Sequence, residues 1–325
     1  MKVNCTKGKR CCPGVPRRSE NERKNKMADI LTKGITKDGF FKISAVVSTE
    51  SVEAARKFHN TSPTATAALG RLLTAGLLMG GELKEDKAKL TLQLKGDGPL
   101  GTVFAAANSK GEVKGYVGNP LADMPLKSNG KLDVGGAVGK GTMCVIKDLC
   151  LKEPYIGQVA IQTGEIGDDL AYYFMQSEQV PSVVALGVLV DRDYSVKCAG
   201  GFIIQVMPEC DDKSLTMLEN SISGITSVTD MLAHGMTGEE IIKYVMLGFD
   251  TDILGSTEVG YVCDCSRERM ERAIISLGKT EIDAIIREQG EAEIVCSFCN
   301  SAYKFDSEQL KAMKESAKDN TQEKN

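Results

Sequence analysis

The chain has 325 residues, of which 42% are hydrophobic and 5% aromatic, and it contains no tryptophan. This length accommodates two or three domains with sizeable cores. The formal net charge is −4, but residues 1–26 hold nine Lys or Arg and only two Asp or Glu, which leaves −11 on the rest of the chain. An acidic body of this kind argues against a general nucleic-acid binder.

The basic segment at residues 1–26 has neither the apolar stretch of a secretory signal nor hydrophobic periodicity, so we expect it to be disordered. The patterned sequence begins at Met27, which we expect to start the functional unit. No apolar run reaches the roughly 20 residues that a membrane helix needs. The nearest run, 64–80, carries Arg71 in its middle and predicts a buried helix. We therefore expect a cytoplasmic protein with no membrane partner.

Residues 27–209 mix helical and strand patterns and predict an α+β domain with a mostly antiparallel sheet and packed helices. Helices are expected at 51–60, 64–80 and 168–179. In 89–101 leucines alternate with polar residues, which is typical of a half-buried strand, and 102–117 is expected to form a hairpin. Further strands are expected at 141–149, 155–163, 182–190 and 196–207.

Residues 210–258 have helical periodicity, with apolar stripes that include Met217, Leu218, Met231 and Leu232. Thr237 followed by Glu240 is a capping-box pattern, typical of the start of a helix. We expect this segment to be a helical linker between two domains.

Residues 259–312 predict a small separate unit. Ser266 is expected to cap one helix and Thr280 a second. Residues 293–305 indicate two strands joined by a tight turn, and Asp306 is expected to start a last helix. The tail, 313–325, is expected to be frayed.

This small unit contains the pattern Cys263-x-Cys265, thirty residues, then Cys296-x-x-Cys299. Two such pairs brought together would offer four thiolates, a closed tetrahedral set for one Zn²⁺ ion per chain. A unit of about 50 residues is marginally stable without a metal or disulfides, and zinc can supply about 10–16 kcal/mol. We expect the unit to be folded with zinc and largely unfolded without it.

The spacing leaves several functions open. The site could be a permanently structural zinc ribbon, or a ribbon that binds nucleic acid through arginines such as Arg267 and Arg269. Glutamates alternate with those arginines, which indicates a solvated helix face instead. A redox switch is a third hypothesis, because neighbouring thiols can form strained, labile disulfides. A disulfide oxidoreductase is disfavoured, because no thioredoxin-like βαβ unit precedes Cys296.

The sequence resembles a known family over residues 27–305. The resemblance rests on "SPTATAALGRLLTAGLLMG", "LKGDGPLG", "VIKDLCLKEPYIGQV", "GEIGDDLAYYFMQSEQVPSVVALGVLV", "CDCSRERMERAIISLGKTEI" and "CSFCNSAYKF". These stretches are similar to those of the redox-regulated bacterial heat-shock chaperones called heat-shock protein thirty-three, and the arrangement of the four cysteines resembles that family's zinc switch.

The resemblance implies a holdase that needs no ATP, rather than an enzyme. It implies that the reduced form holds zinc through Cys263, Cys265, Cys296 and Cys299 and is inactive. It also implies that oxidative stress forms the disulfides Cys263–Cys265 and Cys296–Cys299 and releases zinc. The small unit then unfolds, the linker loses its support, and a homodimer binds unfolding client proteins.

The basic extension with Cys5, Cys11 and Cys12 has no counterpart that we expect in this family, and disorder without a role is the favoured interpretation. Four other cysteines lie in or beside apolar strands, and we expect them to be buried and inert: Cys144, Cys150, Cys198 and Cys210. Residues 134–145 superficially resemble a phosphate loop, but Val134 and Gly141 stand where that motif needs Gly and Ser/Thr. His59 and His234 are isolated and are expected to be surface or helix-packing residues.

Overall fold

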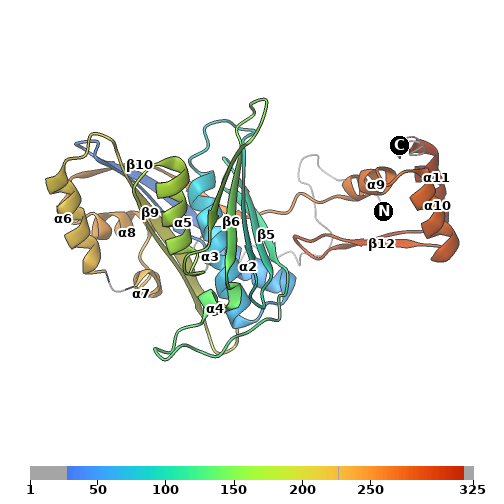
Figure 1. Cartoon of the computed structure of the whole chain (residues 1–325), viewed down its shortest axis with the longest axis horizontal. Helices are drawn as coiled ribbons and strands as arrows, with labels where there is room; N and C mark the ends of the chain where they lie inside the picture. The colour runs from blue at the N-terminus through green and yellow to red at the C-terminus, as the bar shows by residue number, and fades with distance from the viewer. Residues whose placement is uncertain (1–27, 226, 318–325) are drawn as a thin grey trace, which may run out of the picture. The chain divides into compact units, whose positions relative to one another are not determined.

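The computed structural model describes residues 28–225 and 227–317. It divides into two compact units, Met27–Val262 and a second that contains Cys263 and the described residues after it. Figure 1 shows both units, coloured along the chain. The predicted disorder of residues 1–26, the cysteines at 5, 11 and 12, and most of the predicted tail lie outside the described residues.

Two sheets form the frame of the larger unit. One is antiparallel with the order β10-β1-β2-β9-β8, and the other has the order β11-β5-β4-β3-β6-β7, in which only β11 pairs in parallel. The strands of the first sheet are β1 (Ile30–Thr36), β2 (Phe41–Val47), β8 (Ser182–Val190), β9 (Val196–Val206) and β10 (Thr251–Glu258). Those of the second are β3 (Lys89–Gly96), β4 (Thr102–Asn108), β5 (Glu112–Val117), β6 (Gly141–Asp148), β7 (Tyr155–Ala160) and β11 (Gly260–Tyr261). The predicted antiparallel α+β fold is confirmed, although the strands form two sheets where the sequence analysis expected one.

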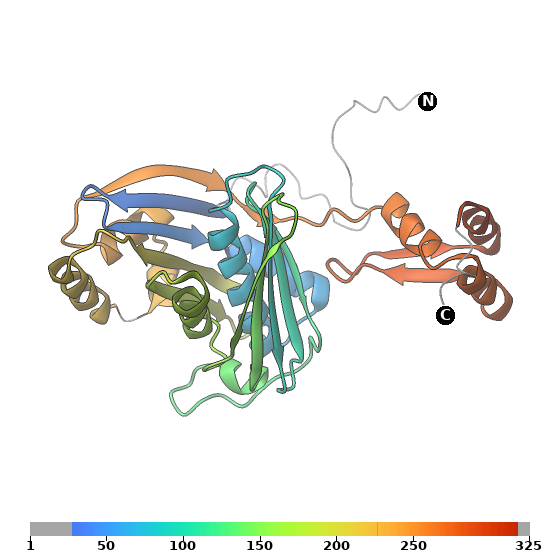
Figure 2. The same ribbon diagram turned by 45° about the horizontal axis from the view of Figure 1, so that its top comes forward.

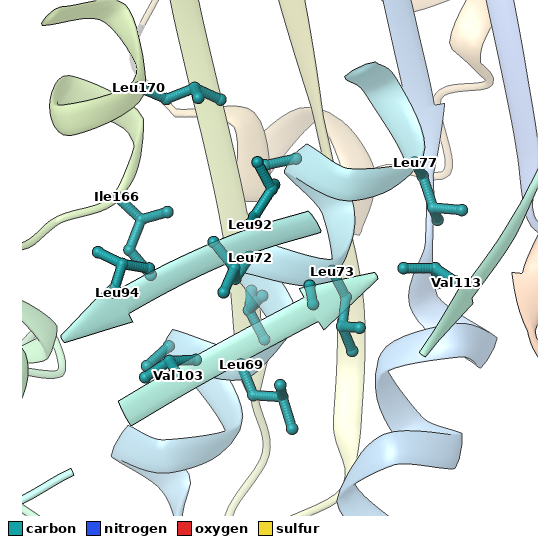
Figure 3. Close-up of a cluster of buried hydrophobic side chains, with 14 of the residues drawn as sticks. Leu69, Leu72, Leu73, Leu77, Leu92, Leu94, Val103, Val113, Ile166 and Leu170 are labelled. Carbon is teal, nitrogen blue, oxygen red and sulfur yellow. The ribbon is translucent and has the colours of Figure 1, made fainter. Parts of the chain in front are cut away.

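Helix α3 (Pro63–Gly80) lies between the two sheets and is buried almost all round. Its apolar residues pack against strands of both sheets. Figure 2 shows these layers, and Figure 3 shows leucines of α3 beside apolar side chains of β3, β4 and β5. Leu73 and Leu77 are at most 1% exposed, in the same cluster as Leu92 of β3 and Val113 of β5. The one charge in the helix, Arg71, pairs with Glu165 at 2.5 Å. The prediction of a buried helix at 64–80 is confirmed.

The larger unit has four further helical elements: α2 (Thr49–His59), α4 (Val134–Val138), α5 (Gly167–Tyr173) and the π-helical turn η1 (Phe174–Glu178). Helices α2 and α4 contact α3, whereas α5 contacts strands β7 and β8. In the described residues no helix has both the length and the hydropathy needed to cross a membrane. The helix α4 is followed directly by strand β6, so the phosphate-loop-like stretch lacks the helix that such a loop precedes.

The other face of the five-stranded sheet is covered by α6 (Asp212–Ser223), α7 (Val228–Ala233) and α8 (Gly238–Val245). Their buried side chains, such as Leu218 and Ile242, pack with Phe41 and Phe202 of the sheet. The predicted capping box of Thr237 and Glu240 is confirmed. The expected helical pattern over 210–258 is wrong at its end, because Thr251–Glu258 forms β10 and pairs with β1. Backbone pairing at an available sheet edge decides this strand, and helical periodicity cannot reveal such an edge.

The second unit consists of α9 (Arg267–Ile275), α10 (Lys279–Glu288), the hairpin β12 (Ala292–Val295) and β13 (Ala302–Phe305), and α11 (Ser307–Ser316). Ser266 caps α9 and Asp306 caps α11, as predicted. Thr280 does not cap α10, because that helix already begins at Lys279, after Gly278 at φ 88°. The chain must turn sharply there, and only glycine adopts such a φ without strain.

The cysteines of the larger unit differ in burial. Cys198 is buried, Cys144 and Cys210 are half-buried, and Cys150 is exposed with φ 61°. The expectation that all four are buried is confirmed for Cys198 and holds only in part for Cys144 and Cys210. It is wrong for Cys150, which lies in the turn after β6 rather than in the strand. His59 is buried at the end of α2 with Nε2 3.0 Å from the Gly115 carbonyl, while His234 is exposed at the end of α7. His59 therefore fits the predicted packing role, and His234 fits the predicted surface role.

Candidate metal centre

Two separate stretches of the second unit carry the four cysteines of the predicted site. Cys263 and Cys265 lie in the extended segment between β11 and α9, just before the cap of α9 at Ser266. Cys296 and Cys299 lie in the turn that joins β12 to β13. The helices α9 and α10 separate the two stretches along the sequence, and the fold brings the stretches together.

The turn between β12 and β13 is shaped by its own backbone. The Asn300 amide donates to the Cys296 carbonyl at 2.8 Å, and the Cys296 amide donates to the Ser301 carbonyl at 2.9 Å. Asn300 has φ 54°, a left-handed conformation that asparagine tolerates better than most residues. The chain therefore reverses within a few residues, and both thiols point to the same side of the turn.

The four sulfur atoms form one cluster. All four Sγ atoms lie within 4.8 Å of one another; Cys263 and Cys296 are 3.7 Å apart, and Cys265 and Cys299 are 3.4 Å apart. A tetrahedron of thiolates with metal–sulfur bonds of about 2.3 Å has edges of about 3.8 Å. The donor set therefore fits one metal ion with little rearrangement, and the structure brings together every predicted ligand.

Burial and hydrogen bonding act differently on the thiols. Cys265, Cys296 and Cys299 are buried, and Cys263 is half-buried. Burial raises the pKa of Cys263, and it raises that of Cys265 to about 11. Burial acts in the same direction on Cys299, but hydrogen bonds with Ser301, Cys265 and Cys263 together outweigh it and lower the pKa of that thiol. Buried thiols of this kind ionise readily only beside a compensating cation, which a bound metal supplies.

Two hydroxyl groups that the sequence analysis did not single out touch the cluster. The hydroxyl of Tyr303 lies 3.1 Å from Cys265 Sγ, and that of Ser301 lies 3.2 Å from Cys299 Sγ. Tyr303 is on β13 and is buried. The available signal was the spacing of Ser301 and Tyr303, because alternate residues of an extended chain point to one side.

The arginines near the first cysteine pair are engaged within the unit. Arg267 lies over the Phe305 ring, 4.4 Å from its centroid, and donates to Gln309 Oε1 at 2.9 Å. Arg269 pairs with Asp264 at 2.7 Å. The helix face is partly solvated, as predicted, but these contacts also tie α9 to β13 and α11.

Comparisons with known proteins agree on one family. The family model described as "Hsp33 protein" matches residues 29–306. A relative from Clostridium botulinum (strain 657 / Type Ba4), named "33 kDa chaperonin", is 51% identical over 285 residues, covering 87% of this chain and 96% of the relative. A protein of the same name from Clostridium perfringens is 52% identical over 286 residues, covering 87% and 90%. The crystal structure of the 33 kDa chaperonin (heat shock protein 33 homolog) from Thermotoga maritima is similar with a TM-score of 0.83 and 36% identity, covering 89% of this chain and 98% of that one.

Proposed function

The chain belongs to the Hsp33 family of redox-regulated chaperones, and we propose that Cys263, Cys265, Cys296 and Cys299 form its zinc-bound redox switch. The single observation that carries this proposal is the convergence of the four Sγ atoms within 4.8 Å. Four soft thiolates in a closed tetrahedral set are typical of structural zinc. In the reduced protein the zinc would hold the second unit folded.

Oxidation would act directly on the ligands. A pair of thiolates gives two electrons to one hydrogen peroxide, whose O–O bond breaks to leave two hydroxide ions, and the two sulfurs join as a disulfide. We propose the pairs Cys263–Cys265 and Cys296–Cys299, although the shortest sulfur separations run between the pairs, at 3.7 and 3.4 Å. Since all separations are within 4.8 Å, neighbouring residues can couple with little movement once the metal leaves.

Loss of zinc would then free apolar surface for clients. The second unit starts at Cys263, directly after the segment in which β10 and β11 pair with the two sheets. Unfolding of that unit would remove support from residues 210–258, the segment predicted as a linker. The cluster that α6, α7 and α8 form with the five-stranded sheet, which includes Leu218, Met231 and Phe202, would become available to unfolding proteins. In this proposal the oxidised protein is a homodimer in the cytoplasm and binds clients without catalysing a reaction.

The two alternatives have less support. A nucleic-acid ribbon would need free basic groups, whereas Arg267 and Arg269 contact Gln309 and Asp264, and the chain after residue 26 carries −11. A disulfide oxidoreductase usually has an exposed attacking thiol, whereas Cys265, Cys296 and Cys299 are buried and Cys263 is half-buried.

The proposal is tested by measuring client aggregation with reduced protein and with protein treated with peroxide at elevated temperature, while a chelating dye follows zinc release. We expect one zinc per chain in the reduced protein, and suppression of aggregation only after zinc release. The variant Cys263→Ser/Cys265→Ser should lose zinc under reducing conditions, whereas Cys150→Ser, which removes an exposed thiol of the larger unit, should keep it. Equal activity in both redox states, or stoichiometric zinc in the double variant, would contradict the proposal.

A further inference from the structure

We propose that Tyr303 is a positioning residue of the switch, which donates a hydrogen bond to the Cys265 thiolate and thereby slows its oxidation. This inference rests on the proposed function, because it concerns the same zinc-bound cysteines. It goes beyond that function because it assigns the rate at which the switch is oxidised to hydroxyl groups that do not bind zinc.

The contact between Tyr303 and Cys265 is short and buried. Tyr303 is 6% exposed, and its hydroxyl lies 3.1 Å from Cys265 Sγ. A buried phenol needs a hydrogen-bond partner, and among the described residues this sulfur is a partner within hydrogen-bond distance. A metal-bound cysteine has lost its proton, so its sulfur can only accept. With zinc in place, the tyrosine O–H must therefore be the donor.

Ser301 repeats the arrangement at the other cysteine pair. Its hydroxyl lies 3.2 Å from Cys299 Sγ, and it stands two residues before Tyr303 on the same extended stretch. These two hydroxyls contact Cys265 and Cys299, whose sulfur atoms are only 3.4 Å apart. A zinc-bound Cys299 would also have lost its proton, so its sulfur would accept from the Ser301 hydroxyl. Ser301, just before β13, and Tyr303, within it, would thus each present one donor to a ligand of a different cysteine pair.

A donated hydrogen bond changes the chemistry of the sulfur. In the first oxidation step the thiolate attacks one oxygen of hydrogen peroxide, the O–O bond breaks, hydroxide leaves and the sulfur becomes a sulfenic acid. A second thiolate then displaces hydroxide from that sulfur to give the disulfide. The hydrogen bond withdraws electron density from the lone pair that must attack, so its removal should speed the first step and weaken the metal site, as loss of outer-shell partners does.

The test compares Tyr303→Phe with the unchanged protein and with Tyr194→Phe. The first substitution removes only the hydroxyl and keeps the buried ring, while the second removes an exposed hydroxyl from the larger unit, where Tyr194 is 58% exposed. We expect peroxide to release zinc from Tyr303→Phe about tenfold faster, at the lower end of the 10–100-fold effects of outer-shell partners. In the cobalt-substituted protein the sulfur-to-metal charge-transfer band should move to lower energy, because the lone pair is no longer stabilised. Tyr194→Phe should match the unchanged protein in both measurements.

Unchanged release rate and cobalt spectrum in a zinc-loaded Tyr303→Phe protein would overturn this inference and leave the proposed function intact. Failure of the unchanged protein to bind one zinc, or to release it on oxidation, would overturn the proposed function itself. If Tyr303→Phe takes up no metal, the zinc release rate and the cobalt spectrum are measured on Ser301→Ala and Ser301→Thr instead. The alanine variant should release zinc faster, and the threonine variant, which retains a hydroxyl, should not; equal rates in the two would refute the role of the hydroxyls.

Discussion

Removal of zinc from the reduced protein should unfold the second unit and leave the larger unit folded. Apart from its cysteines, the described part of the second unit buries six apolar side chains larger than alanine: Ile274, Ile282, Tyr303, Phe305, Leu310 and Met313. At about 1.5–3 kcal/mol each, they contribute roughly 9–18 kcal/mol. A four-thiolate zinc site contributes about 10–16 kcal/mol, so zinc in the proposed site would supply close to half of the favourable free energy. Since whole domains are stable by only about 5–15 kcal/mol, this unit cannot lose that share and stay folded.

Amide hydrogen exchange with and without a strong chelator, in the presence of reductant, measures this directly. We expect α9, α10 and α11 to lose their protection when zinc is removed, while α3, buried between two sheets, keeps its protection. Adding zinc back should restore the original exchange pattern. Persistent protection of α9–α11 in metal-free protein would refute the reasoning, because the six side chains would then suffice on their own.

Three further predictions concern the larger unit. Leu73→Ala should lower its free energy of unfolding by about 2–5 kcal/mol in denaturant titrations, because Leu73 is fully buried between the sheets; a loss below 1 kcal/mol would contradict that packing. Burial raises the pKa of Glu53, but hydrogen bonds from Arg56, the Val196 amide and Lys57 outweigh it and lower the folded-state pKa to about 2. This carboxylate therefore stabilises the fold above its unfolded-state pKa of about 4.3, and the stabilisation, roughly 3 kcal/mol, is lost as the pH falls towards 2. Glu53→Gln should flatten the acid side of the stability curve, and an unchanged curve would count against the assignment. Thr237→Ala removes the cap of α8 and should cost about 1 kcal/mol in thermal unfolding, whereas Thr237→Ser should cost much less.

Local signals in the sequence predicted much of this fold. Helix α3 was predicted from its apolar run, and β3 was predicted from the alternation of its leucines. The helix N-caps at Ser266 and Asp306 could be predicted because each depends on residues only three positions apart. The strand β10 was missed, because it exists by pairing with β1, more than 200 residues away in the sequence. The expected cap at Thr280 was wrong because Gly278 allows the chain to enter α10 two residues earlier.

The candidate metal ligands were predictable because metal binding is tied to residue type and spacing, and cysteine pairs that stay reduced have few other uses. Sequence by itself therefore indicated the four candidate ligands, the buried helix and, through resemblance, the family. Only the tertiary structure decided that the strands form two sheets around α3, that β10 completes one of them, and that Tyr303 and Ser301 touch the sulfurs. These features depend on contacts between distant segments, and such contacts are set by how the folded surfaces meet, which no short window of sequence contains.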